Sequence, residues 1–161
     1  ANAKACQEVF SDATDFTDVQ TDLDTLNQNL KENGLEYVTV DAVMEASDDS
    51  GQMLGYVLTV TDSEGYVGDI QLSMGVRMDG TLNGISILSI SETAGLGMNA
   101  DTDAFKSQFA DKNVEQFTYT KNGASADNEI DAISGATITT NAVTNGVNGG
   151  LLTFQYLKGG N

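Results

Sequence analysis

The sequence predicts an α+β fold, in which a twisted antiparallel sheet packs against N-terminal and C-terminal helices. Apolar residues recur with a helical period near both ends of the chain and alternate with polar residues through the middle. Short turns rich in Asp and Gly separate the alternating segments, so successive strands should pair antiparallel. The 161 residues suit a single domain over 1–161, with a helical N-terminal part at 1–34 and a core at 35–161.

The N-terminal part is predicted to be helical. Leu23, Leu26 and Leu30 have the spacing of one helix face, and Asn33-Gly34 is typical of a C-terminal stop. Cys6 is the only cysteine, which excludes an internal disulfide and a cysteine-ligated iron–sulfur cluster. We interpret Cys6 as a small buried hydrophobe, with a reactive thiol as the alternative.

The middle of the chain is predicted to form four strands. Its segments alternate between apolar and polar residues, as strands with one buried face do. Turn signals made of Asp, Ser, Glu and Gly lie between them. The strands are expected within 38–45, 54–60, 70–78 and 85–90, and the turns at 48–51, 62–65 and 79–80.

The C-terminal part adds a short helix near 105–109, a strand near 117–119 and a long last helix. Glycines inside the last helix weaken it by about 1 kcal/mol each relative to Ala. We therefore expect close approach to the sheet or to another backbone at these positions. The glycines are Gly146, Gly149 and Gly150, and the expected buried stripe is Val143, Val147, Leu151 and Phe154.

The composition excludes several classes of function. The net charge is −17, from 24 acidic and 7 basic residues, and such a surface repels nucleic acid and anionic lipid. The absence of histidine excludes a Ser-His-Asp triad, a Cys-His pair and a His-ligated zinc site. Asp48, Asp49 and Asp62 lack the spacing of an EF-hand loop, so we expect no metal site.

A cluster of hydroxyl groups precedes the last predicted helix. Gly135 and Ala136 are small and leave the hydroxyls of Ser134 and Thr137 sterically open. A helix N-terminus has unpaired N–H groups and a partial positive charge, both of which favour a phosphate. The alternative is that a threonine of this stretch only caps the helix. The candidate caps are Thr137, Thr139 and Thr140.

The string from Asp131 to Thr140 reads Asp-Ala-Ile-Ser-Gly-Ala-Thr-Ile-Thr-Thr, and it closely resembles the flavinylation motif of the FMN-binding domain family. That family includes the G subunit of Rnf-type electron transport complexes and the C subunit of the sodium-translocating NADH:quinone reductase, and the string looks most like that of the Rnf G subunit. The resemblance implies that the Thr137 hydroxyl becomes esterified to the FMN phosphate. A dedicated flavin transferase would use FAD as the donor and would recognise Asp131. The other cofactor-binding residues that the motif implies are Ser134, Gly135, Ala136 and Thr140.

The segment 91–97 resembles the Glu-Thr-Pro-Gly-Leu-Gly loop of the same family, with Ala94 in the place of Pro. The change removes a rigid φ constraint but no chemical group. Alone, the segment would be an ordinary glycine loop that closes a strand. The resemblance implies Glu92 and Thr93 at the polar edge of the flavin ring, Leu96 against its face, and Gly95 and Gly97 where the backbone approaches it closely.

A softer match is Gly65-Tyr66-Val67-Gly68, followed later by the Asp79-Gly80 turn. The family has a Gly-Tyr step and an Asp-Gly turn in this order and at similar spacing. Tyr66 is therefore a candidate flavin contact, with core or turn packing as the alternative. The three matches together cover about 51–154 in the family's order.

The resemblance implies an electron carrier, in which FMN supplies the redox chemistry and the protein holds and tunes it. We expect a redox subunit of a membrane ion-translocating oxidoreductase complex, of the ferredoxin:NAD or NADH:quinone type, rather than an independent catalyst with catalytic residues. Expected partners are the other subunits and, during maturation, the flavin transferase. Two alternatives stay open: a free-standing extracytoplasmic flavoprotein, and a non-redox binding module that has kept the fold.

The same resemblance implies a location on the extracytoplasmic face of the bacterial cell membrane. In the related complexes the flavin domain follows an N-terminal membrane helix. The resemblance implies such a helix upstream of Ala1. No segment of this chain is itself apolar over the length of a membrane span.

Overall fold

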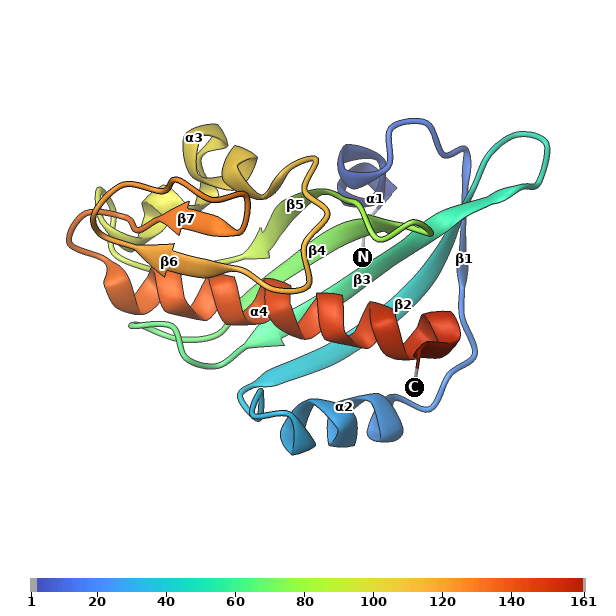
Figure 1. The fold of residues 1–161 in the computed structure, drawn as a ribbon, viewed down its shortest axis with the longest axis horizontal. Coiled ribbons are helices and arrows are strands. Elements are labelled where there is room, and N and C mark those ends of the chain that lie inside the picture. The colour runs from blue at the N-terminus through green and yellow to red at the C-terminus, as the bar shows by residue number, and fades with distance from the viewer. Residues whose placement is uncertain (1–2, 161) are drawn as a thin grey trace.

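The structure is a computed structural model that describes residues 3–160. It confirms the predicted α+β class, with a five-stranded antiparallel sheet and helices packed against it (Figure 1). The sheet and the two helices before it consist of α1 (Ala3–Val9), β1 (Asp15–Asp18), α2 (Leu23–Glu32), β2 (Val38–Ser47), β3 (Met53–Asp62), β4 (Ile70–Arg77) and β5 (Leu82–Ser89). The rest consists of η1 (Gly97–Asp101), α3 (Asp103–Lys106), η2 (Ser107–Phe109), β6 (Thr118–Thr120), β7 (Glu129–Asp131), α4 (Thr137–Gln155) and η3 (Tyr156–Gly160).

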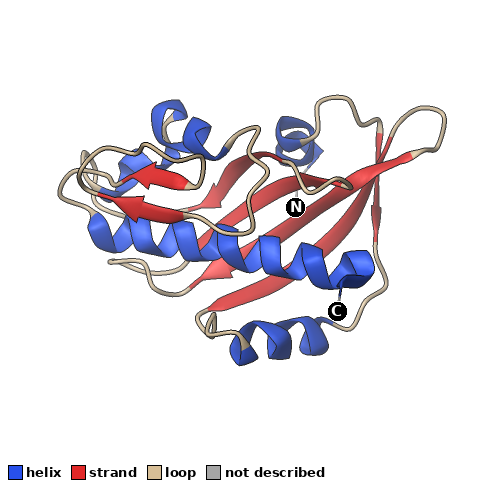
Figure 2. Ribbon diagram, in the orientation of Figure 1, coloured by secondary structure: helices blue, strands red, loops and turns tan. Residues whose placement is uncertain are grey.

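The strands of the main sheet follow one another in space in their order along the chain, β1-β2-β3-β4-β5 (Figure 1); Figure 2 shows the same strands in red. Every neighbouring pair is antiparallel, as the short connections predict. Leu58 lies opposite Met74, and Met74 lies opposite Ile85. All three side chains are buried, so this row faces the main core.

Helices α4 and α1 lie on opposite faces of the sheet. A Cβ atom added to Gly150 of α4 would collide with Met74 of β4. A Cβ atom added to the next residue of that strand, Gly75, would collide with the Val9 carbonyl of α1. Because successive residues of a strand point to opposite faces, the two helices cover different sides. Most of the buried apolar residues belong to the cluster between α4 and the sheet, and a smaller cluster lies under α1.

Two of the three glycines of α4 allow the close approach to the sheet that the sequence predicts. A Cβ atom at Gly149 would lie 2.6 Å from Val38 Cγ1, and one at Gly150 would collide with Met74. At Gly146 the nearest side-chain atom would be 3.5 Å away, which is ordinary contact. The helix therefore approaches β2 and β4 closely over its second half, and its predicted stripe is buried.

The N-terminal part differs from the prediction, because β1 interrupts it. Phe16 is the only apolar residue of this strand, and it pairs with Ala46 of β2. An edge strand of this kind is held by main-chain pairing and carries no alternating pattern. The segment expected to be helical therefore consists of two helices and a strand.

The chain after β5 returns to the start of α4 through a small second sheet. The strand expected near 117–119 is present as β6, and it pairs in parallel with β7, which the sequence did not predict. Because β7 ends at Asp131, five residues connect it to the first residue of α4. This connection contains the hydroxyl-rich motif.

Candidate functional site

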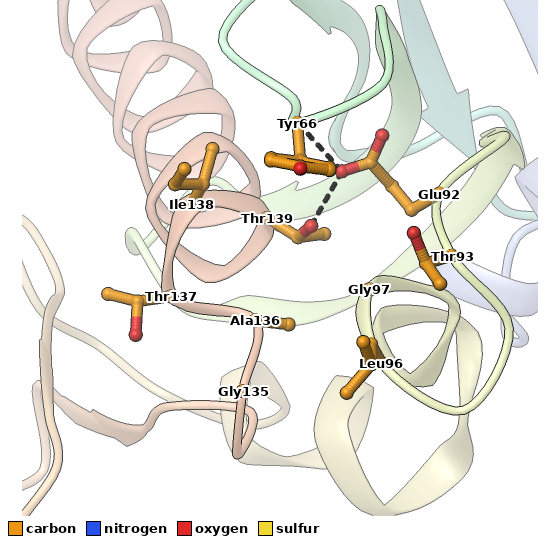
Figure 3. Close-up of a pocket in the computed structure, with 10 residues that line it drawn as sticks. All are labelled: Tyr66, Glu92, Thr93, Leu96, Gly97, Gly135, Ala136, Thr137, Ile138 and Thr139. Atoms are coloured by element: carbon orange, nitrogen blue, oxygen red, sulfur yellow. Dashed lines mark hydrogen bonds between the residues drawn. The ribbon is translucent and has the colours of Figure 1, made fainter.

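The two motifs lie on one pocket, which confirms that they converge. The pocket has a volume of about 570 Å³ and lies between the first turn of α4, the loop after β5 and the loop after β3 (Figure 3). This volume is in the range typical of small-molecule sites. The predicted site residues that line it are Tyr66, Glu92, Thr93, Leu96, Gly97, Gly135, Ala136 and Thr137.

Gly135 and Leu96 bring the two motifs into direct contact. Gly135 has a φ of +74°, a conformation that glycine adopts without strain. A Cβ atom at this position would lie 3.1 Å from Leu96 Cδ2. The glycine therefore makes the turn into α4 and leaves room for the leucine of the other motif.

The start of α4 has no side-chain cap among the described residues. Its N-cap residue is Ala136, and no side chain accepts a hydrogen bond from the first turn. The capping alternative is therefore wrong for each threonine. The first N–H groups of a helix have no acceptor within the helix. Those of the first turn belong to residues that line the pocket, and they are available to an anion there.

The threonine hydroxyls of the motif have different environments. Thr139 is buried, and its Oγ1 donates a hydrogen bond of 2.6 Å to Glu92 Oε1. Thr140 is also buried; its Oγ1 donates to the Ala136 carbonyl at 2.9 Å and accepts from the Ile133 N–H at 3.0 Å. The Thr137 hydroxyl has no hydrogen-bond partner among residues 3–160, and Thr137 is one of the residues that line the pocket. Of the three threonines, Thr137 alone has an uncommitted hydroxyl.

The remaining predicted residues of this motif lie beside the pocket rather than on it. Ser134 is exposed, and in the described part of the chain its hydroxyl has no partner. Asp131 is exposed, and its Oδ1 accepts a hydrogen bond of 2.6 Å from the Ala124 N–H. Its own N–H donates to Gln108 Oε1 at 2.7 Å. Asp131 thus connects the loop after β6 to η2, while its surface position leaves it accessible to a modifying enzyme.

The structure corrects the expectation that Glu92 hydrogen-bonds the ring of a ligand. Its carboxylate is buried and points to the protein, as Figure 3 shows. Oε1 accepts from the Tyr66 N–H at 2.8 Å and from Thr139, and Oε2 accepts from the N–H groups of Val67 at 2.8 Å and Gly68 at 3.3 Å. A carboxylate has about four acceptor positions, so these partners occupy all of them.

The Glu92 carboxylate is ionised at neutral pH. Burial alone raises the pKa of Glu92, but the hydrogen bonds from Thr139 and from three backbone N–H groups outweigh it and lower the pKa below its usual value. Among the described residues that line the pocket, Glu92 is also the only charged one. A bound phosphate would therefore depend on backbone N–H groups rather than on Lys or Arg.

The walls of the pocket carry exposed apolar side chains. Tyr66 is 71% exposed, Ile138 51% and Leu96 42%, and each comes from a different segment. This exposure contradicts the alternative that Tyr66 packs in the core. A flat aromatic ligand would cover part of this apolar surface, while the open side would leave one edge accessible.

Two residues of the pocket were not among the predicted ones, Ile138 and Thr139. Besides Ser134, two of the predicted cofactor-binding residues do not line it, Gly95 and Thr140. Gly95 adopts a φ of +77° and makes the turn that brings Leu96 to the pocket. Thr140 stabilises the connection before α4 through its two hydrogen bonds.

Outside the pocket, Cys6 has the character of a buried hydrophobe. It is 1% exposed, its Sγ lies 3.9 Å from Met44 Sδ, and burial raises the pKa of its thiol. The burial and the raised pKa oppose a reactive thiolate. Within residues 3–160, no group of three or more His, Cys, Asp or Glu side chains is arranged to hold a metal ion.

Comparison with known proteins agrees with this geometry. Residues 65–151, more than half of the chain, match the FMN-binding domain family, and this range contains all three segments that form the pocket. The chain belongs to the FMN-binding domain family. It is 33% identical over 159 residues to the G subunit of the Na(+)-translocating ferredoxin:NAD(+) oxidoreductase complex of Acetobacterium woodii, covering 98% of this chain and 75% of that protein.

Two further relatives extend the comparison. The chain is 42% identical over 102 residues to the G subunit of the proton-translocating ferredoxin:NAD(+) oxidoreductase complex of Clostridium ljungdahlii, covering 63% of this chain and 54% of the relative. The crystal structure of Shewanella oneidensis NqrC has the same fold, with a TM-score of 0.64, 16% identity, and coverage of 100% of this chain and 91% of that one. The chain thus spans between half and three quarters of the length of the Acetobacterium and Clostridium proteins.

None of the helices in the described range 3–160 is both long and apolar enough to cross a membrane.

Proposed function

We propose that this FMN-binding domain is an electron carrier that holds FMN covalently through the Thr137 hydroxyl. The observation that carries the proposal is the convergence of both motifs on one pocket, in which Thr137 alone among the three threonines has an uncommitted hydroxyl. Attachment would form a bond between Thr137 Oγ1 and the FMN phosphorus. It would break the diphosphate of FAD, release AMP, and transfer the hydroxyl proton to a base of the flavin transferase.

The residues of the chain suit the two ends of such a ligand. The uncapped first turn of α4 provides N–H groups and a partial positive charge for the phosphate. Tyr66, Leu96 and Ile138 provide apolar surface for the ring system. When bound, FMN supplies reversible electron transfer, and the protein fixes its place and its electrostatic surroundings. The open side of the pocket would allow electron exchange with a partner.

The proposed assembly is based on the relatives. The Acetobacterium and Clostridium proteins are G subunits of ion-translocating ferredoxin:NAD(+) oxidoreductase complexes, and nearly the whole chain is covered in the comparison with the Acetobacterium protein. The proposal therefore includes a role as the corresponding redox subunit, with the other subunits as electron partners. It also includes an extracytoplasmic position, with membrane attachment through a segment outside this sequence.

The experiment is production of the chain together with a flavin transferase, followed by in-gel flavin fluorescence after denaturation. The unchanged chain should keep its flavin, and Thr137→Ala should lose it while the fold persists by circular dichroism. Ser134→Ala is the matched control, because Ser134 has the other uncommitted hydroxyl of the motif, and this variant should keep the flavin. Flavin retained by Thr137→Ala, or lost by Ser134→Ala, would refute the assignment.

A further inference from the structure

The start of α4 offers more than one hydroxyl to an enzyme that modifies threonine. Thr137 and Thr139 are two positions apart, both line the same pocket, and both have a β-branched secondary hydroxyl. On a helix they differ by about 200° in direction, so one can face the phosphate position while the other faces the interior. The surroundings of the two hydroxyls must therefore determine which of them is modified.

We propose that Glu92 determines which threonine accepts the flavin, by keeping the Thr139 hydroxyl out of the reaction. The proposal rests on the proposed function, since it concerns the choice between acceptors for the same transfer. Glu92 does not touch the reacting atoms of Thr137, so it is a positioning residue. It is expected to affect which threonine is modified and not the transfer reaction itself.

The first observation is the bond itself. The Thr139 hydroxyl donates a hydrogen bond of 2.6 Å to Glu92 Oε1. This is a short, charge-assisted hydrogen bond. Thr139 is 2% exposed and Glu92 is 7% exposed, so water competes little with this bond. To react, Thr139 would have to give up the bond and leave a buried carboxylate with one partner fewer.

The second observation is that Glu92 cannot easily turn away. Three consecutive backbone N–H groups, those of Tyr66, Val67 and Gly68, hold the same carboxylate. On the opposite side, a Cβ atom added to Gly97 would lie 2.6 Å from Glu92 Cβ and 2.6 Å from Thr139 Oγ1. The backbone at Gly97 therefore lies so close to both partners that no side chain would fit there. The bond is fixed by three segments of the chain.

The third observation is the distribution of charge. The Glu92 carboxylate carries a negative charge beside Thr139, and the described pocket lining contains no cation to balance it. An anionic diphosphate is repelled from that side of α4. On the Thr137 side, the uncapped helix N-terminus attracts it. Sequestration of one hydroxyl and repulsion of the donor thus favour the same acceptor.

The test is peptide mapping by mass spectrometry after production of the full chain with the flavin transferase. The unchanged chain should carry flavin on Thr137 and Thr137→Ala on no residue, because Glu92 still holds Thr139. The double variant Thr137→Ala/Glu92→Gln should carry flavin on Thr139, with a signal at least tenfold above the background measured in the single Thr137→Ala variant. Adding Thr139→Val to the double variant should remove it again.

A second measurement tests the proposal even if the double variant does not fold. In Glu92→Gln with Thr137 intact, the fraction of flavin found on Thr139 should rise at least tenfold relative to the unchanged chain. A residue with only a structural role would lower the total flavin without moving it to Thr139. Flavin on Thr137 alone in Glu92→Gln, with none on Thr139 in the double variant, would overturn this inference. Flavin absent from Thr137 in the unchanged chain would instead refute the proposed function.

Discussion

Asp62 provides a sharp test of the physical account, because it is a buried carboxyl group with an incomplete set of hydrogen bonds. It is 1% exposed at the end of β3. Its Oδ1 accepts from the Glu64 N–H at 2.6 Å, whereas Oδ2 is buried without a hydrogen-bond partner among the described residues. Burial, followed by the Glu64 side chain and the charge of Asp69, raises the pKa of Asp62 to about 8.

The raised pKa makes stability depend on pH in a defined direction. In the unfolded chain Asp62 ionises near pH 4, whereas in the folded protein it keeps its proton to about pH 8. Between these values the folded state binds one more proton, so the free energy of unfolding falls as the pH rises. The slope from this residue approaches about 1.4 kcal/mol per pH unit.

Asp62→Asn removes this ionisation and keeps an oxygen that can accept the Glu64 N–H. At pH 7, about three pH units above the unfolded pKa, the variant should be more stable than the unchanged chain by about 2–4 kcal/mol. At pH 4.5 the difference should be under about 1 kcal/mol. Urea denaturation followed by circular dichroism at both pH values measures it.

The matched control is Asp69→Asn, because Asp69 is exposed and close enough to contribute to the shift. This variant leaves Asp62 ionisable, so it should retain most of the pH slope. A stability difference between Asp62→Asn and the unchanged chain that is the same at both pH values would refute the reasoning. So would a less stable variant at pH 7.

Close contacts and a second carboxylate support three further predictions. Gly97→Ala should destabilise the protein by about 1–3 kcal/mol in urea denaturation, because its Cβ would lie 2.6 Å from Glu92 Cβ. Gly84→Ala should change the stability little, because the nearest atom to its Cβ would be 3.9 Å away. Gly149→Ala should destabilise α4 because its Cβ would lie 2.6 Å from a valine of β2, whereas Gly146→Ala should stabilise it by up to about 1 kcal/mol through helix propensity. Glu92→Gln should be less stable than the unchanged chain at pH 6, and this difference in stability should shrink below pH 4. Because the pKa of Glu92 is lowered in the folded protein, its ionised carboxylate stabilises the fold at neutral pH, and this stabilisation is lost on acidification.

Each of these predictions has an outcome that contradicts it. Equal effects of alanine at 97 and 84, or at 149 and 146, would mean that the backbone adjusts freely at the close contacts. A Glu92→Gln deficit that stays constant from pH 6 to pH 3.5 would mean that the ionised carboxylate has no special role in the folded state.

The parts of the fold that carry a side-chain period could be predicted from the sequence. Strands β2 to β5 alternate and were expected close to their observed bounds, and the last helix was expected from its 3.6-residue stripe, which is buried. β1 was not expected, because Phe16 alone cannot define a period and the strand exists through main-chain pairing with β2. The parallel partner of β6 was also missed, because three residues are too few for a pattern.

The position of the site was predictable, but the direction of its side chains was not. Because both motifs were expected to bind one flavin, the 92–97 loop was expected near Thr137, and the two segments do line one pocket. The sequence could not show that Glu92 turns inward, since its partners come from the loop after β3 and depend on the tertiary fold. One signal was present for Thr139: two residues from Thr137 on a helix, it must face another side.

The most direct test of the central claim is a crystal structure of the chain after flavinylation by the transferase. We predict continuous electron density from Thr137 Oγ1 to a phosphate at the first turn of α4. The ring should lie between Tyr66, Leu96 and Ile138, with the Glu92–Thr139 hydrogen bond unchanged. Density from a different residue, or a ring bound outside this pocket, would contradict this prediction.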